Sequence, residues 1–298
     1  MKFTQLLAVS LFSTVLFQSA HAESNNAAAK DVGTVIVGSA DFPESQLLAT
    51  IYAGALTANN IKVEKKLNIG SREVYLPALL DGSIHLLPEY SGATLSYLDH
   101  ATQAHSSAEV EKALAAALPP GIRMLEISSA QNSDVLAVTE KTARQYNLKT
   151  IDDLAPIAGQ LVLGGPAEWK SRREGVKGLQ DVYGLTFKSF KVLDVAGPLT
   201  LSALRNNQIQ VADLTSTTPE LKKNHLVALS DPRNLFLAQN IVPLIAEDKL
   251  NGTIETVLNK VSARLTTEDL IAMNEKLGNF ESIDDVADAW LVQHGIKQ

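Results

Sequence analysis

Cysteine is absent from this sequence of 298 residues. Its absence excludes disulfide bridges, thiolate catalysis and cysteine metal sites together. It also excludes a lipid anchor on an N-terminal cysteine, so we expect the mature chain to carry no such anchor.

Catalytic motifs are also lacking. The sequence contains no Gly-x-Ser-x-Gly, no phosphate-binding loop, no Gly-x-Gly-x-x-Gly and no His-Glu-x-x-His. The six histidines are scattered and form no close pair at the spacing of metal ligands. We therefore predict no catalytic residue, no metal site and no cofactor, and we interpret His85, on an expected strand, as a satisfied core or surface residue.

Positive charge is in deficit: 26 lysines and arginines stand against 33 aspartates and glutamates, a formal net charge of −7. An acidic chain lacks the electrostatic footprint of a protein that binds nucleic acid or anionic lipid. The acidic pairs Asp152-Asp153 and Asp284-Asp285 fall at expected helix starts, where they complement the helix dipole. A catalytic role for these pairs is the weaker alternative.

The first residues have the pattern of a secretory signal peptide. Lys2 precedes a mostly apolar run over residues 6–17, and Ala20-His21-Ala22 has the small-x-small form that signal peptidase cleaves. A membrane helix is the weaker alternative, because the run falls far short of the roughly 20 residues that span a bilayer. We predict a signal peptide over residues 1–22, cleaved after Ala22, and a flexible leader over 23–31.

Strand and helix patterns alternate through the rest of the chain. Apolar, β-branched runs at 32–37, 61–67 and 83–87 indicate buried strands, and amphipathic helices follow Pro43 and Ser71. Pro88 is expected to close the third strand. The alternation predicts a parallel sheet with helices on its faces, and from about residue 141 the scheme repeats as a second α/β lobe inserted into the first.

Six short motifs occur in a fixed order, at residues 37–44, 67–74, 77–82, 87–92, 130–132 and 211–213. Each is weakly specific alone, but their order is specific. Through them the mature chain resembles the substrate-binding proteins of glycine betaine/carnitine/choline ABC importers, which take up osmoprotectant quaternary amines.

The resemblance implies a type II periplasmic binding protein fold of class α/β. Two lobes are then joined by two crossing segments, near residues 128–132 and 230–234, and a small organic solute binds in the cleft between them. Lobe 1 is predicted at 32–130 and 233–298, and lobe 2 at 131–232. The implied partners are the permease and ATPase subunits, and the implied protein is monomeric and, lacking a lipid anchor, retained in the periplasm of a Gram-negative cell.

In the family that the chain resembles, aromatic side chains enclose a quaternary ammonium by cation–π attraction, and a basic group with a hydroxyl holds the ligand's carboxylate. Tyr90 matches one aromatic wall, Asn132 matches the polar residue at the first crossing, and Arg172 matches the carboxylate-binding arginine, with Arg173 one residue along as the alternative.

The departures from this pattern change the expected ligand. Asp134 stands where an aromatic residue is usual, Thr215 and Ser216 follow the Val-Ala-Asp motif where another is usual, and residues 237–240 read Leu-Ala-Gln-Asn. Carboxylate, hydroxyl and amide groups suit a ligand that donates hydrogen bonds better than a methylated ammonium, which cannot. We therefore expect a ligand shifted toward a polar amine or zwitterion.

The predicted ligand-binding residues are Ser39, Tyr90, Asn132, Asp134, Trp169, Arg172, Thr215, Ser216 and Gln239. Several have a structural alternative. Ser39 can cap the following helix, Trp169 can be a packing residue, and Asp134 can pair with a surface lysine. Arg72-Glu73, at a helix start, is interpreted as a structural pair on the lobe surface.

Two other classes of function remain open on the sequence. One is an enzyme built on the same bilobal fold, which the missing catalytic set disfavours. The other is a solute-sensing partner protein, which neighbouring genes for a sensor kinase, in place of a permease and an ATPase, would indicate.

Overall fold

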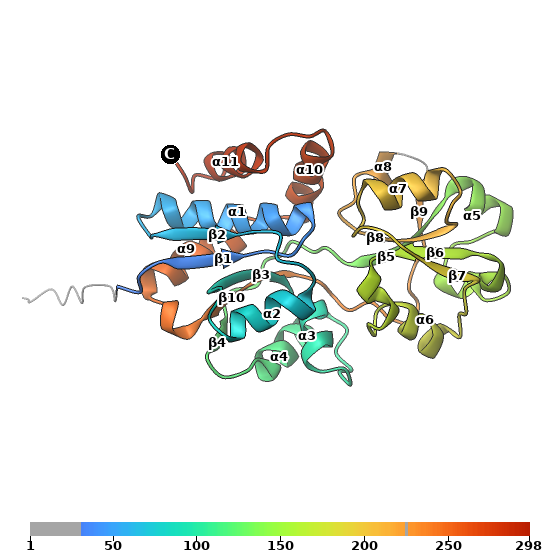
Figure 1. The fold of residues 1–298 in the computed structure, drawn as a ribbon, viewed down its shortest axis with the longest axis horizontal. Coiled ribbons are helices and arrows are strands. Elements are labelled where there is room, and N and C mark those ends of the chain that lie inside the picture. The colour runs from blue at the N-terminus through green and yellow to red at the C-terminus, as the bar shows by residue number, and fades with distance from the viewer. Residues whose placement is uncertain (1–30, 224–225) are drawn as a thin grey trace, which may run out of the picture.

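The computed structural model describes residues 31–223 and 226–298. The predicted signal peptide and almost all of the predicted leader lie outside these residues. Two lobes lie side by side (Figure 1), each built on a five-stranded sheet. The strands of the two sheets do not mix, since β5 to β9 form one sheet while β1 to β4 and β10 form the other.

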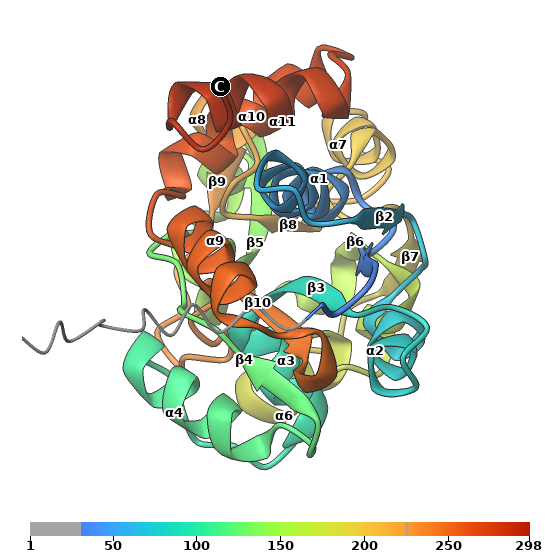
Figure 2. The ribbon, with the colours of Figure 1, turned by 90° about the vertical axis from the view of Figure 1, so that its left-hand side faces the viewer.

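The first lobe has the strand order β2-β1-β3-β10-β4. Its strands are β1 (Val35–Gly38), β2 (Val63–Lys66), β3 (Leu86–Tyr90), β4 (Ile122–Met124) and β10 (Ile241–Ala246). Its helices are α1 (Pro43–Ala58), α2 (Arg72–Leu80), α3 (Ser91–Leu98), α4 (Ser107–Ala117), α9 (Gly252–Ser262), α10 (Thr267–Gly278) and α11 (Ile283–Gln293), with the 3₁₀ turn η4 (Glu247–Lys249). Figure 2 shows α1, α10 and α11 on one side of this sheet and α3 and α4 on the other.

The second lobe has the strand order β7-β6-β8-β5-β9. Its strands are β5 (Asp134–Thr139), β6 (Val162–Gly165), β7 (Ser189–Val192), β8 (Val211–Thr215) and β9 (Leu226–Ala228). Its helices are α5 (Glu140–Tyr146), α6 (Val176–Tyr183), α7 (Pro198–Arg205) and α8 (Glu220–Lys223), with the 3₁₀ turns η1 (Ile151–Leu154), η2 (Ala158–Gln160) and η3 (Ala167–Lys170).

Both sheets are mixed, so the expectation of parallel sheets is wrong in part. β1 runs parallel to β2 and β3, but β10 runs antiparallel to both of its neighbours. In the second lobe β5 likewise runs antiparallel to β8 and β9. β10 and β5 are the first strands after the chain has changed lobe, and a buried apolar run does not encode the direction in which its strand enters a sheet.

Pro88 lies inside β3 and does not end it, contrary to the sequence-based expectation. Its register partner on β10 is Pro243, whose carbonyl accepts from the Leu125 N–H on the β4 side of β10. The pairing of β3 with β10 therefore does not need an N–H from either proline. Helix α1 begins at Pro43 as expected, with Pro43 and Glu44 in its first turn, where a missing N–H costs nothing and a negative charge favours the helix dipole.

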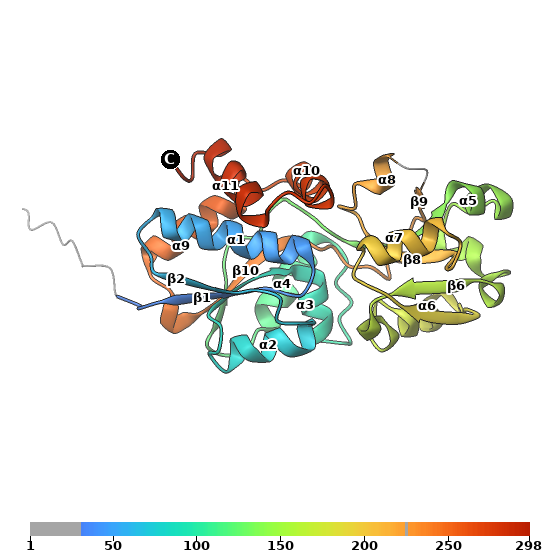
Figure 3. The same cartoon turned by 45° about the horizontal axis from the view of Figure 1, so that its top comes forward.

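Two segments, residues 125–133 and 229–240, carry the chain between the sheets, and both are visible in Figure 1 and, from another side, in Figure 3. They are held together at Gln131 and Asn240 by an antiparallel bridge, beside which the Asn132 N–H donates to the Gln239 carbonyl at 2.9 Å. Leu235 packs in the core of the second lobe and Leu237 in that of the first. The lobe limits given above, 32–130 with 233–298 and 131–232, stand as a proposal.

Candidate functional site

A cavity of about 50 Å³ lies between the two lobes, where the loops after β1 and β6 meet. The first lobe lines it with Ala40, Asp41, Phe42, Ser71, Arg72 and Tyr75, and the second with Asp134, Pro166, Glu168, Trp169, Arg172, Val195 and Asp213. Ligands of α/β sheets bind at the carboxyl ends of parallel strands, which is where these loops begin. The volume is far below the roughly 300 Å³ of an ordinary ligand pocket, so the lobes are closed on each other here.

Two aspartates of the second lobe form the acidic floor of this cavity. Asp134 begins β5 and Asp213 lies on β8, and the register Asp134↔Thr215 and Leu136↔Asp213 makes them diagonal neighbours on one face of the sheet. Asp213 is 4% exposed, and its Oδ1 accepts no hydrogen bond from the described residues. The cavity therefore contains a carboxyl oxygen that can still accept a hydrogen bond, for instance from a ligand N–H.

Burial and mutual repulsion disturb the titration of both aspartates. Burial, and then the charge of Glu174, raises the pKa of Asp134 to about 7. Burial, and then the charge of Asp134, raises the pKa of Asp213 well above its usual range. Arg172 acts in the opposite direction on both groups but does not offset burial. A cation placed between the two carboxylates would relieve their repulsion.

The unliganded protein is expected to lose stability as the pH rises from about 5 to about 8. The folded-state pKa of Asp134, about 7, lies above its unfolded value. This group therefore stabilises the fold fully below pH ~4, and the contribution is lost as the pH rises through about 7. Thermal unfolding should show a fall of several degrees across this range, and Asp134→Asn should flatten it. A wild-type profile that rises between pH 5 and 8 and is unchanged by the substitution would contradict this prediction.

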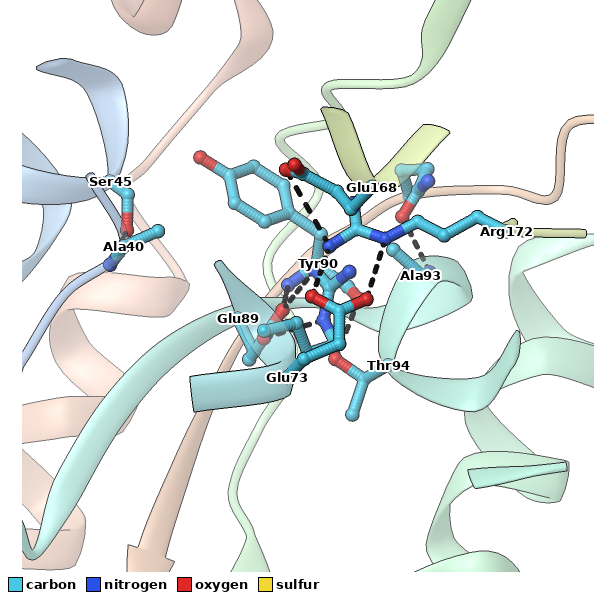
Figure 4. Close-up of polar contacts among 11 residues, drawn as sticks. Ala40, Ser45, Glu73, Glu89, Tyr90, Ala93, Thr94, Glu168 and Arg172 are labelled. Atoms are coloured by element: carbon cyan, nitrogen blue, oxygen red, sulfur yellow. Dashed lines mark hydrogen bonds and ion pairs between the residues drawn. The ribbon is translucent and has the colours of Figure 1, made fainter. Parts of the chain in front are cut away.

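The two arginines beside the cavity already have carboxylate partners. Arg72 donates through Nε and Nη2 to Glu89, at 2.9 and 3.0 Å, inside the first lobe. Arg172 donates through Nε and Nη2 to Glu73 of the opposite lobe, at 3.0 Å each, and Figure 4 shows it between Glu73 and Glu168. The interpretation of Arg72 and Glu73 as a pair with each other is therefore wrong, because each is bonded to another residue. Residues one apart on a helix point in different directions.

Three aromatic rings line the cavity: Phe42, Tyr75 and Trp169. Trp169 is 1% exposed and stacks on Phe236, with ring centroids 6.2 Å apart, so it packs the lobe as well as lining the cavity. The Arg72 guanidinium lies 5.8 Å from the centroid of the Tyr75 ring and occupies one of its faces. The aromatic lining is therefore partial, and an acidic floor accompanies it.

A second polar cluster lies around Glu44, whose side chain is buried on α1. Tyr90 and Asn132 donate to its Oε1 at 2.9 and 2.6 Å, while Thr217 and Asn274 donate to its Oε2 at 2.6 and 2.5 Å. The donors come from β3, from the first crossing segment, from the loop after β8 and from α10. Neutral donors from both lobes thus converge on one carboxylate, and the cluster fixes the closed arrangement beside the crossing.

The structure brings three of the predicted ligand-binding residues to the cavity, namely Asp134, Trp169 and Arg172. The other six do not line it. Tyr90 and Asn132 point to Glu44, Ser39 donates to the Ala40 carbonyl, and Gln239 accepts from the Ala93 N–H. Ser216 accepts from the Ser133 N–H, and Thr215 contacts the hydroxyls of Thr217 and Thr218. The assignment of these nine residues to ligand binding remains a proposal.

Sequence reasoning missed Asp213, Glu73 and Glu44 as members of these clusters. Asp213 ends the Val-Ala-Asp motif, and Glu44 ends the motif at residues 37–44, so both stood inside stretches already singled out. The period-2 alternation of β8 places Asp213 on the same face as Thr215, which is a signal that could have found it. Contact between Glu73 and a residue 99 positions away leaves no local signal in the sequence.

Two α/β lobes, linked by two segments and closed on a small polar cavity, define a bilobal solute-binding protein. The profile of one family, the substrate-binding domain of ABC-type glycine betaine transport systems, matches residues 33–293. The chain belongs to this family.

Curated proteins similar to this chain are also solute-binding proteins of transport systems. The carnitine transport binding protein OpuCC of Listeria monocytogenes is 27% identical over 285 residues, covering 92% of this chain and 90% of that protein. The glycine-betaine-binding protein of Pseudomonas aeruginosa is 24% identical over 258 residues, covering 82% of each. Among solved structures, that of a glycine betaine/carnitine/choline ABC transporter protein has a TM-score of 0.70 at 22% identity and covers 88% of this chain and 99% of its own. That likeness confirms the fold.

Substrate-binding proteins of ABC importers work outside the cytoplasm, and the relatives are transport proteins with a solute-binding role. Within residues 31–223 and 226–298, no helix combines the length and the apolar character that crossing a membrane requires.

Proposed function

We propose that this protein receives a small organic solute with a protonated amine in its interlobe cleft and presents it to the permease and ATPase subunits of an importer. The observation that carries the proposal is the acidic floor of the cavity, where Oδ1 of Asp213 receives no hydrogen bond from the part of the chain that the structure describes. An N–H of the solute would donate to this oxygen, and the positive charge of the solute would reduce the repulsion between the two aspartates. A quaternary ammonium, as in the ligands named for the relatives, would supply only the charge.

Binding would work by closure of the lobes and needs no chemical step. The two crossing segments are the hinges, and Glu44 is bonded from both lobes beside them. The closed form would dock on the importer as a monomer. We further propose that residues 1–22 are removed on export and that the protein works in the periplasm.

A thermal-shift panel tests the ligand class. The mature protein is unfolded and refolded to remove any solute carried through purification, and is then heated with small primary and secondary amines, polar amino acids, choline, carnitine or glycine betaine at millimolar concentration. A ligand at 100 times its dissociation constant adds about 2.7 kcal/mol of stability, which is a rise of several degrees. We expect the amines to give the largest rise. A rise with glycine betaine or carnitine that exceeds that of every amine would contradict the proposed class, although it would leave the transport role intact.

A further inference from the structure

The ion pair between Arg172 and Glu73 joins the two lobes across the mouth of the cavity. Arg172 follows η3 of the second lobe, whereas Glu73 is the second residue of α2 in the first lobe. Both hydrogen bonds are 3.0 Å long, and they use two nitrogens and two oxygens, the bidentate geometry that an arginine makes with a ligand carboxylate. Figure 4 shows the Glu73 carboxylate directed at the guanidinium.

This pair is well protected for one at a surface. The side chain of Arg172 is 19% exposed and that of Glu73 is 43% exposed. Burial raises the pKa of Glu73, but the hydrogen bonds from Arg172, from Ser71 and from its own backbone N–H, together with the charge of Arg172, outweigh burial and lower that pKa to about 2. Glu73 also lies in the first turn of α2, where the helix dipole favours a negative charge. The carboxylate therefore stays ionised and paired throughout the neutral range.

The position of the pair relative to the cavity gives it a consequence for ligand choice. Arg172 lines both the inner cavity and an outer crevice of about 290 Å³, while Glu73 lines only the crevice. The Nε and Nη2 of Arg172 are thus engaged by a carboxylate outside the inner cavity. A ligand carboxylate inside the cavity would have to take Arg172 from Glu73, which is tethered beside it and competes as a group at millimolar effective concentration.

The charges that remain inside the cavity act in the same direction. Arg72 is held by Glu89, and the lining carboxyls without an ion pair among the described residues are those of Asp41, Asp134 and Asp213. A negative charge brought by the ligand would face these carboxyls at short range in a poorly solvated space, which is unfavourable, whereas a positive charge is attracted.

We infer that Glu73 takes the place of a ligand carboxylate at Arg172 and helps to hold the lobes closed there without a ligand, so that the cleft selects amine cations without a carboxylate and discriminates against zwitterions. The inference rests on the proposed function and deepens it by naming the excluded half of the ligand class. It makes Glu73 a specificity-determining residue that acts through Arg172 and does not touch the solute.

The test compares two matched pairs of probes, ethanolamine with glycine and choline with glycine betaine, in which a hydroxymethyl group and a carboxylate exchange. Affinities are measured by calorimetry for the wild-type protein and for Glu73→Gln. The wild type should bind the cation of at least one pair tenfold or more tightly than its zwitterion. Glu73→Gln should reduce that ratio at least tenfold, mainly by gaining affinity for the zwitterion. Glu247→Gln, which breaks a more exposed ion pair with Arg123 inside the first lobe, should leave the ratio unchanged.

A second readout needs no solute. Small-angle scattering of the ligand-free protein should give a smaller radius of gyration for the wild type and for Glu247→Gln than for Glu73→Gln. If Glu73→Gln changes neither the radius nor the ratio, the inference is overturned. If Glu73→Gln opens the lobes while none of the four probes binds the wild type, the proposed amine class fails and the closing role of Glu73 stands.

Discussion

Arg72→Ala is expected to lower the free energy of unfolding by about 3–5 kcal/mol, because it leaves the carboxylate of Glu89 buried and without its cation. The side chains of Arg72 and Glu89 are 6% and 1% exposed, and two hydrogen bonds of 2.9 and 3.0 Å join them. Urea unfolding at pH 7 measures the loss. The matched control is Arg123→Ala, which breaks an exposed 3.6 Å pair with Glu247 and should cost at most about 1 kcal/mol.

The size of this loss should depend on pH. Burial alone would raise the pKa of Glu89, but the charge of Arg72 and the hydrogen bonds from it hold this pKa below its usual range. This depressed pKa stabilises the wild type above the unfolded pKa of about 4.3, and that contribution is lost as the pH falls through the folded value. The difference between Arg72→Ala and wild type should therefore shrink in acid. A loss below 1 kcal/mol at pH 7, equal to that of the control, would show that the pair is not a buried one.

Asp213→Asn is expected to change stability and affinity in opposite directions. Removing one charge of the Asp134–Asp213 pair relieves a repulsion in a buried site, so the ligand-free protein should unfold several degrees higher. The same change removes half of the acidic floor, and truncating one partner of a buried charged contact costs about 2–5 kcal/mol, which is a loss of roughly 30-fold or more in amine affinity.

Calorimetry and thermal unfolding of this variant separate a ligand-binding role from a structural one. Replacing an aspartate with a structural role would lower the stability of the protein, whereas replacing one that is held against repulsion in order to bind a ligand would raise it. The control is Asp288→Asn, an exposed aspartate paired with Lys297, which should change neither quantity beyond about 1 kcal/mol. Unchanged amine affinity in Asp213→Asn would remove the acidic floor from the proposed site.

The local elements could be predicted because their signals are local. Pro43 and Glu44 mark the start of α1, and the apolar runs mark β1 and β2 within a few residues. The direction of β10 could not be predicted in this way, since it depends on how the chain returns from the second lobe. Pro88 was misread for a related reason, because a proline is acceptable inside a strand where the neighbouring strand does not need its N–H, and that depends on the register with β10.

In the candidate site, too, the features with a local signal could be predicted, whereas those that depend on the tertiary structure could not. Asp134 was found because its residue type departs from the pattern that the chain resembles, and it does line the cavity. Tyr90 was placed by its motif, yet the motif does not say that its hydroxyl turns to Glu44. The pairing of Arg172 with Glu73 depends on how the two lobes meet, which no stretch of the sequence encodes.

Native mass spectrometry of the protein released from the periplasm, without unfolding, tests the central claim most directly. The account predicts one small solute bound per chain, a cation with at least one N–H and no carboxylate, and it predicts that Asp213→Asn carries much less of it. Glycine betaine or carnitine bound at full occupancy, in the wild type and in Asp213→Asn alike, would contradict the account.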